Sequence, residues 1–454
     1  MAIAQLIAQN IMDTGDFECL TTEVVDTAKK MMLNAAAVSL AAAAQSDGQV
    51  ITKFVQEMGG NGKCTIIGQG LRSSPAYASL ANGLMVRLLD FDDEIIPLGI
   101  HPSCTVFPIV MALGEMSGAT GQDVIRAFVH GCNVTSKLSA LTTDINPESG
   151  NPLLPNTNIT PQVIGSTVAA GILLGLDSTQ LEHAMTISAD YIYDINRNPT
   201  RASSALISGQ IAMQGIISGR LAQLGLSDNK NPHISLDQII NCDTDVSETE
   251  LLNNYLNSDC HINKPGVTLK LYPCNSASHS VIDAALQIVQ LHRIEAAQIK
   301  KVHVSITQDA MTKMAYSSPV SAWEARSSTG YITAIALLHG HPLIDFFSDS
   351  ALEDSEVRLF MDRISVEATE EPSSLAPYPS TISIELENGQ EIYQTTEFAR
   401  GQPQLPLEDE ELDAKFLYCS RYILPPDHIE EAIDSFRGLE NIANITGMAS
   451  VLGG

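Results

Sequence analysis

Apolar residues recur mainly at helical spacing through the first 265 positions of the chain. A long helix rich in Ala, Leu and Met is expected to begin after the cap residues Thr21 and Thr22. Further helices are expected over residues 75–90, 104–117, 121–142, 161–174, 178–191 and 204–224. Alternation typical of strands is nearly absent here. The pattern therefore predicts an all-helical domain over residues 1–266, whose many alanines allow close helix packing.

The pattern changes after residues 264–266 (Lys-Pro-Gly). Strand-like alternation over residues 267–271 and 300–307 flanks a helix predicted at 280–293, and another helix is predicted at 331–338. Two further strands, at residues 380–387 and 391–397, enclose an Asn-Gly hairpin turn. These elements predict a smaller α+β domain over residues 267–398. The remaining helical residues, 399–454, are expected to pack back on the first domain, so the predicted fold class is mainly α.

Length and charge restrict the class of partner. A chain of 454 residues, 44% hydrophobic and 17% charged, is typical of a globular protein with two or three domains. Its 53 acidic and 25 basic residues give a net charge of −28, which repels phosphate backbones and anionic lipids. We therefore expect neither nucleic acid nor a membrane as a partner. A small anionic substrate remains compatible, because a few local cations in a dry pocket can outweigh a distant acidic surface.

The cysteines and the N-terminus indicate the compartment. Eight scattered cysteines show no Cys-x-x-Cys pair and no zinc-finger spacing, as expected of free thiols in a reducing environment. The first 20 residues lack a basic segment followed by an apolar run, and no apolar stretch of about 18 residues occurs. We expect a cytoplasmic protein.

A crowded acidic segment is the first candidate for chemistry. Residues 90–94 read Asp-Phe-Asp-Asp-Glu at the C-terminal end of a predicted helix, where carboxylates repel one another and face the negative end of the helix dipole. His101, placed before Pro102 at the next helix start, is expected to meet Asp90 as a base and its orienting partner. A solvated helix exit is the alternative. Metal ligation has no distinctive spacing here, and no metal is predicted.

Three further segments hold polar residues at element boundaries. His279 follows a strand and a Pro turn at the junction of the predicted domains, where clefts form, although a cap histidine is more often structural. Tyr331, at a helix start, is able to donate to a developing oxyanion, and packing would also explain it. Arg201 precedes a helix whose N-terminal amides suit a carboxylate. No dinucleotide, Walker A, serine-hydrolase or zincin motif occurs, so no cofactor is predicted.

In this order, these segments resemble those of the MmgE/PrpD family. The resemblance is carried by Asp-Phe-Asp-Asp at 90–93 with His-Pro-Ser at 101–103, and by Tyr-Pro-Cys at 272–274 with His279. It implies a helical domain built from both ends of the chain and an inserted α+β lid domain. It also implies a homodimer and an active site in a cleft that uses neither metal nor organic cofactor.

The resemblance and the polar segments described above together give the predicted site residues. Catalytic roles are implied for Asp90, His101, His279 and Tyr331. The substrate-binding positions are Glu94, Asn156, Asn158, Arg201, Ser204 and Lys270. Three of these depart from the family pattern, since Asn156 replaces a histidine, Ser204 a lysine, and Glu94 a residue that is often threonine. Arg201, one helical turn before Ser204, is a possible substitute for the missing charge.

The implied chemistry is removal of a proton beside a carboxylate or carbonyl, with loss of hydroxide or CO2. Either Asp90 or His101 serves as the base, with His279 and Tyr331 as acid and oxyanion donor. Without the lysine and one histidine, a tricarboxylate would leave a buried anion unpaired at a cost of about 2–4 kcal/mol. We therefore predict a cofactor-independent lyase for a small organic acid that is not strongly polyanionic, in a specialised biosynthetic pathway. An isomerase, epimerase or cyclase, and a binding protein without turnover, are the alternatives.

Overall fold

The computed structural model describes residues 3–59, 62–145, 159–192, 201–227, 256, 258–369 and 376–454. Helices dominate and the sheets are small, which confirms the mainly α fold class. Packing divides the chain into two compact units. The helical unit comprises Met1–Leu88, Asp92–Val267 and Glu408–Gly454, and the α+β unit comprises Leu89–Phe91 and Thr268–Leu407. Residues 89–91, which include the first two residues of the acidic segment, thus belong to a different unit from their neighbours in sequence.

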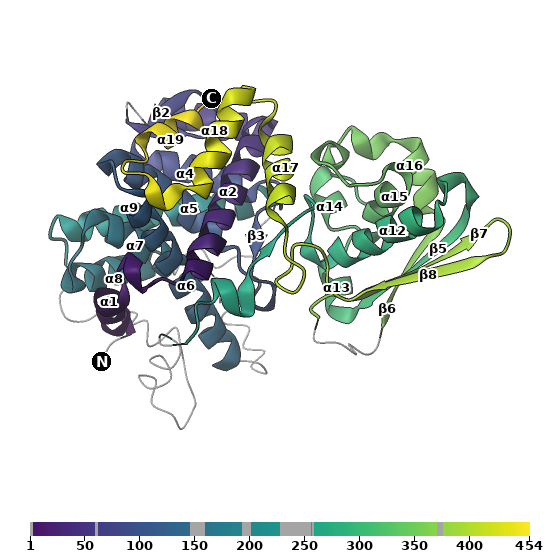
Figure 1. The fold of residues 1–454 in the computed structure, drawn as a ribbon, viewed down its shortest axis with the longest axis horizontal. Helices are drawn as coiled ribbons and strands as arrows, with labels where there is room; N and C mark the ends of the chain where they lie inside the picture. The colour runs from purple at the N-terminus through teal and green to yellow at the C-terminus, as the bar shows by residue number, and fades with distance from the viewer. Residues whose placement is uncertain are drawn as a thin grey trace. The chain divides into compact units, whose positions relative to one another are not determined.

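The helical unit contains twelve of the described α-helices and a short β-hairpin (Figure 1). The helices are α1 (Ile3–Thr14), α2 (Thr22–Ala43), α3 (Ser46–Met58), α4 (Pro75–Arg87), α5 (Pro102–Ser117), α6 (Gly121–Ile145), α7 (Ile159–Leu174), α8 (Ser178–Ile192), α9 (Arg201–Gln223), α17 (Asp409–Ser420), α18 (Pro426–Arg437) and α19 (Thr446–Val451). The strands are β1 (Cys64–Ile66), antiparallel to β2 (Leu71–Ser73), and the two-residue β3 (Asp93–Glu94). Among these described helices, none is apolar over a length that would cross a membrane.

Local sequence signals account for two helix ends. Thr21 caps α2 as predicted, with its hydroxyl oxygen accepting from the backbone N–H of Val24 at 3.3 Å. The helix predicted over 75–90 ends earlier, at Arg87. Asp90 has a φ of 52°, a left-handed conformation through which a right-handed helix cannot continue. The early end of α4 therefore releases the acidic segment from the helix.

Small residues let the central helices of this unit approach closely. A Cβ atom at Gly83 in α4 would lie 2.9 Å from the Cα atom of Gly209 in α9. A Cβ atom at Gly209 would lie only 2.2 Å from the carbonyl oxygen of Leu80. Contacts this short leave no room for a side chain, so the two glycines set the separation of α4 and α9.

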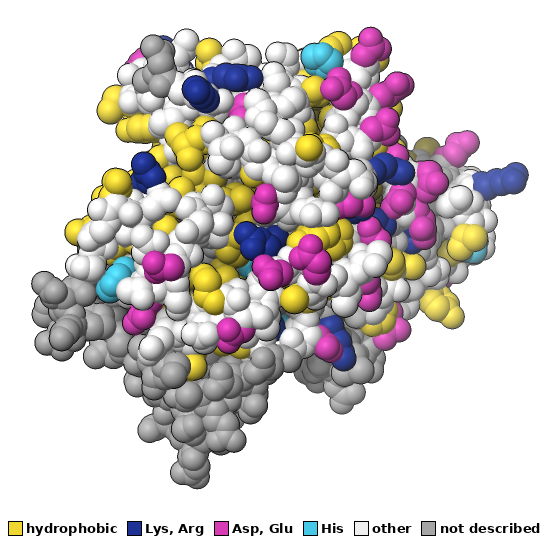
Figure 2. All heavy atoms as spheres, turned by 60° about the vertical axis from the view of Figure 1, so that its left-hand side comes forward, with side chains coloured by type: hydrophobic (Ala, Val, Ile, Leu, Met, Phe, Trp, Pro, Cys, Tyr) yellow, Lys and Arg dark blue, Asp and Glu magenta, His cyan; other side chains and the backbone are white. Residues whose placement is uncertain are grey.

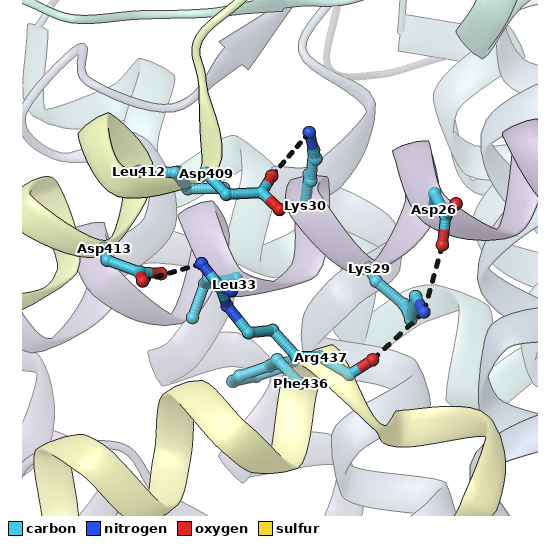
Figure 3. Close-up of a pocket in the computed structure, with 9 residues that line it drawn as sticks. All are labelled: Asp26, Lys29, Lys30, Leu33, Asp409, Leu412, Asp413, Phe436 and Arg437. Atoms are coloured by element: carbon cyan, nitrogen blue, oxygen red, sulfur yellow. Dashed lines mark hydrogen bonds and ion pairs between the residues drawn. The ribbon is translucent and has the colours of Figure 1, made fainter.

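Ion pairs join α17 to α2 and α18 to α17, and a hydrogen bond joins α18 to α2, as Figure 3 shows. The Lys30 ammonium lies 2.7 Å from Asp409 at the start of α17, and the Arg437 guanidinium at the end of α18 lies 2.6 Å from Asp413. Lys29 lies 3.1 Å from Asp26 and donates to the carbonyl of Arg437 at 3.0 Å. These contacts surround a hollow of about 280 Å³. Because each cation already faces a carboxylate, the hollow is better explained as a structural junction than as an anion site.

The α+β unit is built on a four-stranded sheet in the order β6-β5-β7-β8. Strand β5 (Ile299–Thr307) runs parallel to β6 (Ile364–Thr369) and antiparallel to β7 (Ser380–Leu386), which pairs antiparallel with β8 (Glu391–Thr396). The other elements are β4 (Thr268–Leu269), α12 (His279–His292), α13 (Gln308–Lys313), α14 (Ala322–Arg326), α15 (Thr329–His339) and α16 (Ser355–Met361). Gly389, at the predicted turn between β7 and β8, has a φ of 84°.

Strand alternation places this unit's core on one face of the sheet. Ile382 and Ile384 in β7 and Val304 in β5 are fully buried, whereas their neighbours along each strand are partly exposed. Helix α12 packs against β7 and β8, and α15 against β6, as Figure 1 shows. Since His279 is the first residue of α12, this packing fixes the position of its backbone.

We expect Gly209→Ala to lower the free energy of unfolding by about 1–3 kcal/mol, because the added methyl group overlaps the backbone of α4. Gly447→Ala in α19 is the matched control. Nothing lies within 4 Å of a Cβ atom there, so the better helix propensity of Ala should leave stability equal or higher. Urea denaturation of both variants checks this. A Gly209→Ala protein as stable as the Gly447→Ala protein would contradict the close packing of α4 and α9.

Candidate functional site

His101 is held by oxygen acceptors in the helical unit. It occupies the N-cap position of α5, and Nδ1 lies 2.9 Å from the carbonyl oxygen of Asp93 and 3.3 Å from Oδ2 of Asp92. A carbonyl only accepts hydrogen bonds, so Nδ1 carries the proton in the neutral ring. Nε2 is then the ring atom with a lone pair, and the side chain is 16% exposed. This arrangement suits a general base.

The carboxylate that meets this ring is Asp92. Its side chain is fully buried, and Oδ1 lies 3.2 Å from Nη1 of Arg87 at the end of α4. The guanidinium therefore balances part of its charge and fixes its orientation toward His101. Neither Asp92 nor Arg87 is among the site residues predicted from the sequence. The signal was present in the acidic segment and in an arginine five residues before Asp92, but spacing alone did not reveal which carboxylate turns inward.

Asp93 adds a second buried carboxyl group beside this pair. Burial, followed by the charge of Asp92, raises the pKa of Asp93 to about 7. The Ser103 hydroxyl and the charge of His101 offset part of that rise. Two neighbouring aspartates at one histidine thus have different environments, one paired with an arginine and the other without a cation.

In the α+β unit, Asp90 forms a buried ion pair with Lys270. The Lys270 ammonium lies 2.7 Å from Oδ1 of Asp90 and 3.2 Å from its backbone carbonyl oxygen. Lys270 is 1% exposed and Asp90 4% exposed. The left-handed backbone of Asp90 directs both oxygen atoms to one ammonium group. A non-glycine residue in this conformation carries strain of order 1 kcal/mol or more, which is typical of functional segments.

His279 lies in an aromatic cluster of the same unit. Its side chain is 1% exposed, and its ring packs edge-on against that of Tyr272, with the ring centroids 5.1 Å apart. The Tyr272 ring also contacts that of His341, at a centroid distance of 4.8 Å. The Tyr272 hydroxyl donates to Asp283 at 2.5 Å, and Asp283 also accepts from the backbone N–H of Arg400 at 2.7 Å. The cluster holds the His279 ring in a defined orientation. Tyr272 and Asp283 were not predicted as site residues.

Tyr331 is fully buried in α15, and its hydroxyl donates to the carbonyl oxygen of Phe346 at 2.6 Å. Burial raises the pKa of the phenol to about 12, so it keeps its proton at neutral pH. Since a phenol has a single proton to donate, service as an oxyanion donor requires release of the Phe346 carbonyl. The observed contacts alone favour a structural role, and the catalytic role of Tyr331 stays a prediction.

The structure describes the side chains of some of the remaining predicted site residues and not of others. Glu94 is partly exposed in β3. Ser204 is partly exposed in the first turn of α9, and its carbonyl accepts from the Ser208 hydroxyl at 3.4 Å. Arg201 begins α9, but its side chain lies outside the described residues, as do Asn156 and Asn158. Within the described ranges, no group of three or more His, Cys, Asp or Glu side chains is arranged to hold a metal ion.

Comparison with known proteins matches two family domains. The MmgE/PrpD N-terminal domain is matched over residues 5–232 and the MmgE/PrpD C-terminal domain over residues 272–440. Cis-aconitate decarboxylase of Homo sapiens is 26% identical over 451 residues, which cover 96% of this chain and 91% of that protein. The Mus musculus cis-aconitate decarboxylase is 26% identical over 457 residues, covering 96% and 90%. The cis-aconitate decarboxylase-like protein oryM of Aspergillus oryzae is 20% identical over 482 residues, covering 96% and 94%.

We expect Lys270→Met to lower the free energy of unfolding by about 3–5 kcal/mol, because it leaves the Asp90 carboxylate buried without its cation. The double variant Lys270→Met with Asp90→Asn should recover much of that loss, since asparagine tolerates the left-handed backbone and needs no counter-charge. Urea denaturation of the two single variants and the double variant measures the coupling. Lys300→Met, which removes the exposed partner of Glu385, is the control and should change the free energy of unfolding little, because solvent screens this pair. Additive losses would contradict the buried pair.

Proposed function

The chain belongs to the MmgE/PrpD family of dehydratase- and decarboxylase-type lyases, and from that premise we propose that His101 is the base of a cofactor-independent lyase. The enzyme removes a proton next to a carboxylate or carbonyl group of a small organic acid. Hydroxide then leaves as the electron pair of the broken C–H bond forms a double bond. In decarboxylation, CO2 leaves in place of the proton, and the carbanion that remains takes up a proton from the acid of the site.

One observation carries the choice of base. The Asp93 carbonyl accepts a hydrogen bond from Nδ1 of His101, and the Asp92 carboxylate lies 3.3 Å from the same nitrogen, which leaves Nε2 to take up the proton. As the imidazolium forms, the buried Asp92 carboxylate stabilises its charge. Asp90 is the less suitable base, because its carboxylate is already bonded to the Lys270 ammonium. A substrate proton would compete with that ion pair.

His279 and Tyr331 complete the proposal as acid and oxyanion donor, on the strength of the family resemblance. The His279 ring is oriented by Tyr272, and Nε2 lies 3.3 Å from the carbonyl oxygen of Cys274. The Tyr331 hydroxyl has to leave the Phe346 carbonyl to take its role. Positioned proton donors of this kind contribute about 10²–10⁴ to the rate.

The substrate proposed is less anionic than cis-aconitate, the tricarboxylate from which the relatives take their name. Ser204 stands where the family pattern has a lysine, and a serine hydroxyl cannot neutralise a carboxylate. An unpaired buried carboxylate costs several kcal/mol, so a tricarboxylate would bind poorly unless another cation replaced the lysine. Arg201, one turn earlier in α9, is the residue we propose for a partial replacement.

The test incubates the purified protein with mono-, di- and tricarboxylic acids, including cis-aconitate, in deuterium oxide. A net loss of 18 mass units from an acid establishes dehydration, and a net loss of 43, in which one solvent deuteron replaces CO2, establishes decarboxylation. Deuterium uptake without other mass change would instead indicate an isomerase using the same base. We expect His101→Ala to lower kcat by about 10²–10⁴, because the proton acceptor is removed.

His303→Ala is the matched control for that experiment, since this histidine lies partly exposed on β5 and pairs with Glu367. It should leave kcat unchanged. Full activity in the His101→Ala protein would overturn the assignment of the base.

We also propose that the protein is a homodimer that buries an apolar groove of the helical unit. The groove, of about 430 Å³, is lined by the start of α4 and the ends of α5, α7 and α9, including Leu113, Met116, Leu174, Ile217 and Leu221. Figure 2 turns the α7 and α9 side of the molecule forward and shows hydrophobic side chains gathered on it. Among the described lining residues there is an arginine, Arg220, and no acid. In a chain of net charge −28, such a surface is where a second copy meets the least repulsion.

For the dimer, light scattering after size exclusion should give about twice the chain mass of 48.7 kDa. Leu221→Glu should produce monomers at micromolar concentration, because it places a charge in the apolar contact. Leu291→Glu is the control, since Leu291 is 70% exposed on α12, outside the groove. A monomeric parent protein, or a Leu221→Glu protein that remains dimeric, would rule out this interface.

A further inference from the structure

Asp92 and Asp93 are consecutive, and both are fully buried, but their carboxyl groups have unequal partners. Asp92 faces Arg87 and His101. Neither carboxyl oxygen of Asp93 has a hydrogen-bond partner at ordinary geometry among the described residues. The Ser103 hydroxyl, which faces Asp93, is likewise without one. A carboxylate in such a place would lose its hydration without receiving donors in exchange, and the neutral acid is the form that tolerates this.

The charges of the groups around Asp93 also favour its neutral form. Asp92, on the preceding residue, repels a second negative charge, and the thiols of Cys104 in α5 and Cys132 in α6 lie within electrostatic range. Burial and the carboxylates raise the pKa of both thiols, so neither supplies a charge at neutral pH. The cation facing Asp93 is His101 when that ring is protonated.

We propose that Asp93 is a positioning residue that holds a proton beside the Asp92–His101 pair, and that loss of this proton impairs the base as pH rises. The inference rests on the proposed role of His101. The link is direct, because the backbone carbonyl of Asp93 holds the Nδ1–H of His101 at 2.9 Å. A neutral Asp93 leaves Asp92 as the carboxylate that orients the ring. An ionised Asp93 brings a second, unpaired charge into the same site and draws donors, Ser103 first, toward itself.

The pH dependence has a definite sign. In the folded state the pKa of Asp93 is about 7, raised from an ordinary value of 3.8. The stability contributed by the neutral form is therefore fully present below about pH 4 and is lost as pH rises toward 7. Asp93→Asn keeps the shape of the neutral acid and cannot ionise. We expect the Tm of Asp93→Asn to match the parent near pH 4 and to exceed it increasingly up to about pH 7, with a constant difference above that.

Activity gives the second readout. For the parent, kcat/KM should fall above pH 7 by up to tenfold per pH unit, the limit for loss of one essential proton. Asp93→Asn should retain kcat/KM within about threefold at pH 6 and lack that fall. Asp13→Asn, an exposed aspartate in α1, is the control and should reproduce the parent in both measurements. If kcat/KM of Asp93→Asn fell above pH 7 as it does in the parent, the positioning role would be overturned.

The two readouts separate this inference from the proposed function. If no acid is turned over but the Tm difference has the expected pH dependence, the lyase assignment fails and the protonated Asp93 stands. If Asp93→Asn does not fold, infrared spectroscopy of the parent between pH 5 and 9 replaces it. A protonated carboxyl band that persists at pH 6 and disappears above about pH 7 supports the proposal, and the absence of such a band at pH 6 refutes it.

Discussion

The structure depends on how three buried carboxyl groups in one short segment are compensated. Asp90 is paired with Lys270, and Asp92 is paired with Arg87 and His101. The Asp93 carboxyl group has no lysine or arginine partner among the described residues. An isolated buried carboxylate costs more free energy than a folded chain can ordinarily tolerate. The three groups therefore represent three solutions, which are an ammonium partner, a guanidinium–imidazole partner, and a retained proton. Such differences in charge between neighbouring groups are common at catalytic sites, and they are the basis of the proton transfer proposed for this segment.

The scaffold serves this segment by ending and restarting helices around it. Helix α4 ends at Arg87, which places that guanidinium against Asp92, and α5 restarts at Pro102, which fixes His101 at an N-cap. The close approach of α4 and α9 through Gly83 and Gly209 holds the first of these helices rigidly. Positional precision at the histidine is thus a product of helix packing rather than of the loop itself.

The acidic surface and the site obey different rules. A net charge of −28 repels polyanions at long range, yet salt screens exposed charges beyond about 8–10 Å. Inside the protein, the charge of a buried group is balanced by the few cations close to it, as Lys270 does for Asp90 and Arg87 for Asp92. In the proposed function, the serine at position 204, where the family pattern is predicted to have a lysine, therefore has more weight for substrate choice than the surface charge. On the surface, the apolar groove beside Arg220 differs from the acidic remainder, because no acidic residue is among its described lining residues.

The sequence by itself determined the fold class and the family. Helical periodicity, the cap at Thr21 and the Asn-Gly turn are local signals that predict the elements. The Asp-Phe-Asp-Asp and His-Pro-Ser segments are short motifs that indicate the family. It did not show which aspartate meets His101, nor that Asp93 lacks a donor. The three aspartates are chemically identical, and their charge states differ because each side chain is buried beside different groups. Arg87 is close to Asp92 because a helix ends early, and Lys270 reaches Asp90 across 180 positions. Only tertiary structure decides such contacts, because burial and distance set the energy of a charge.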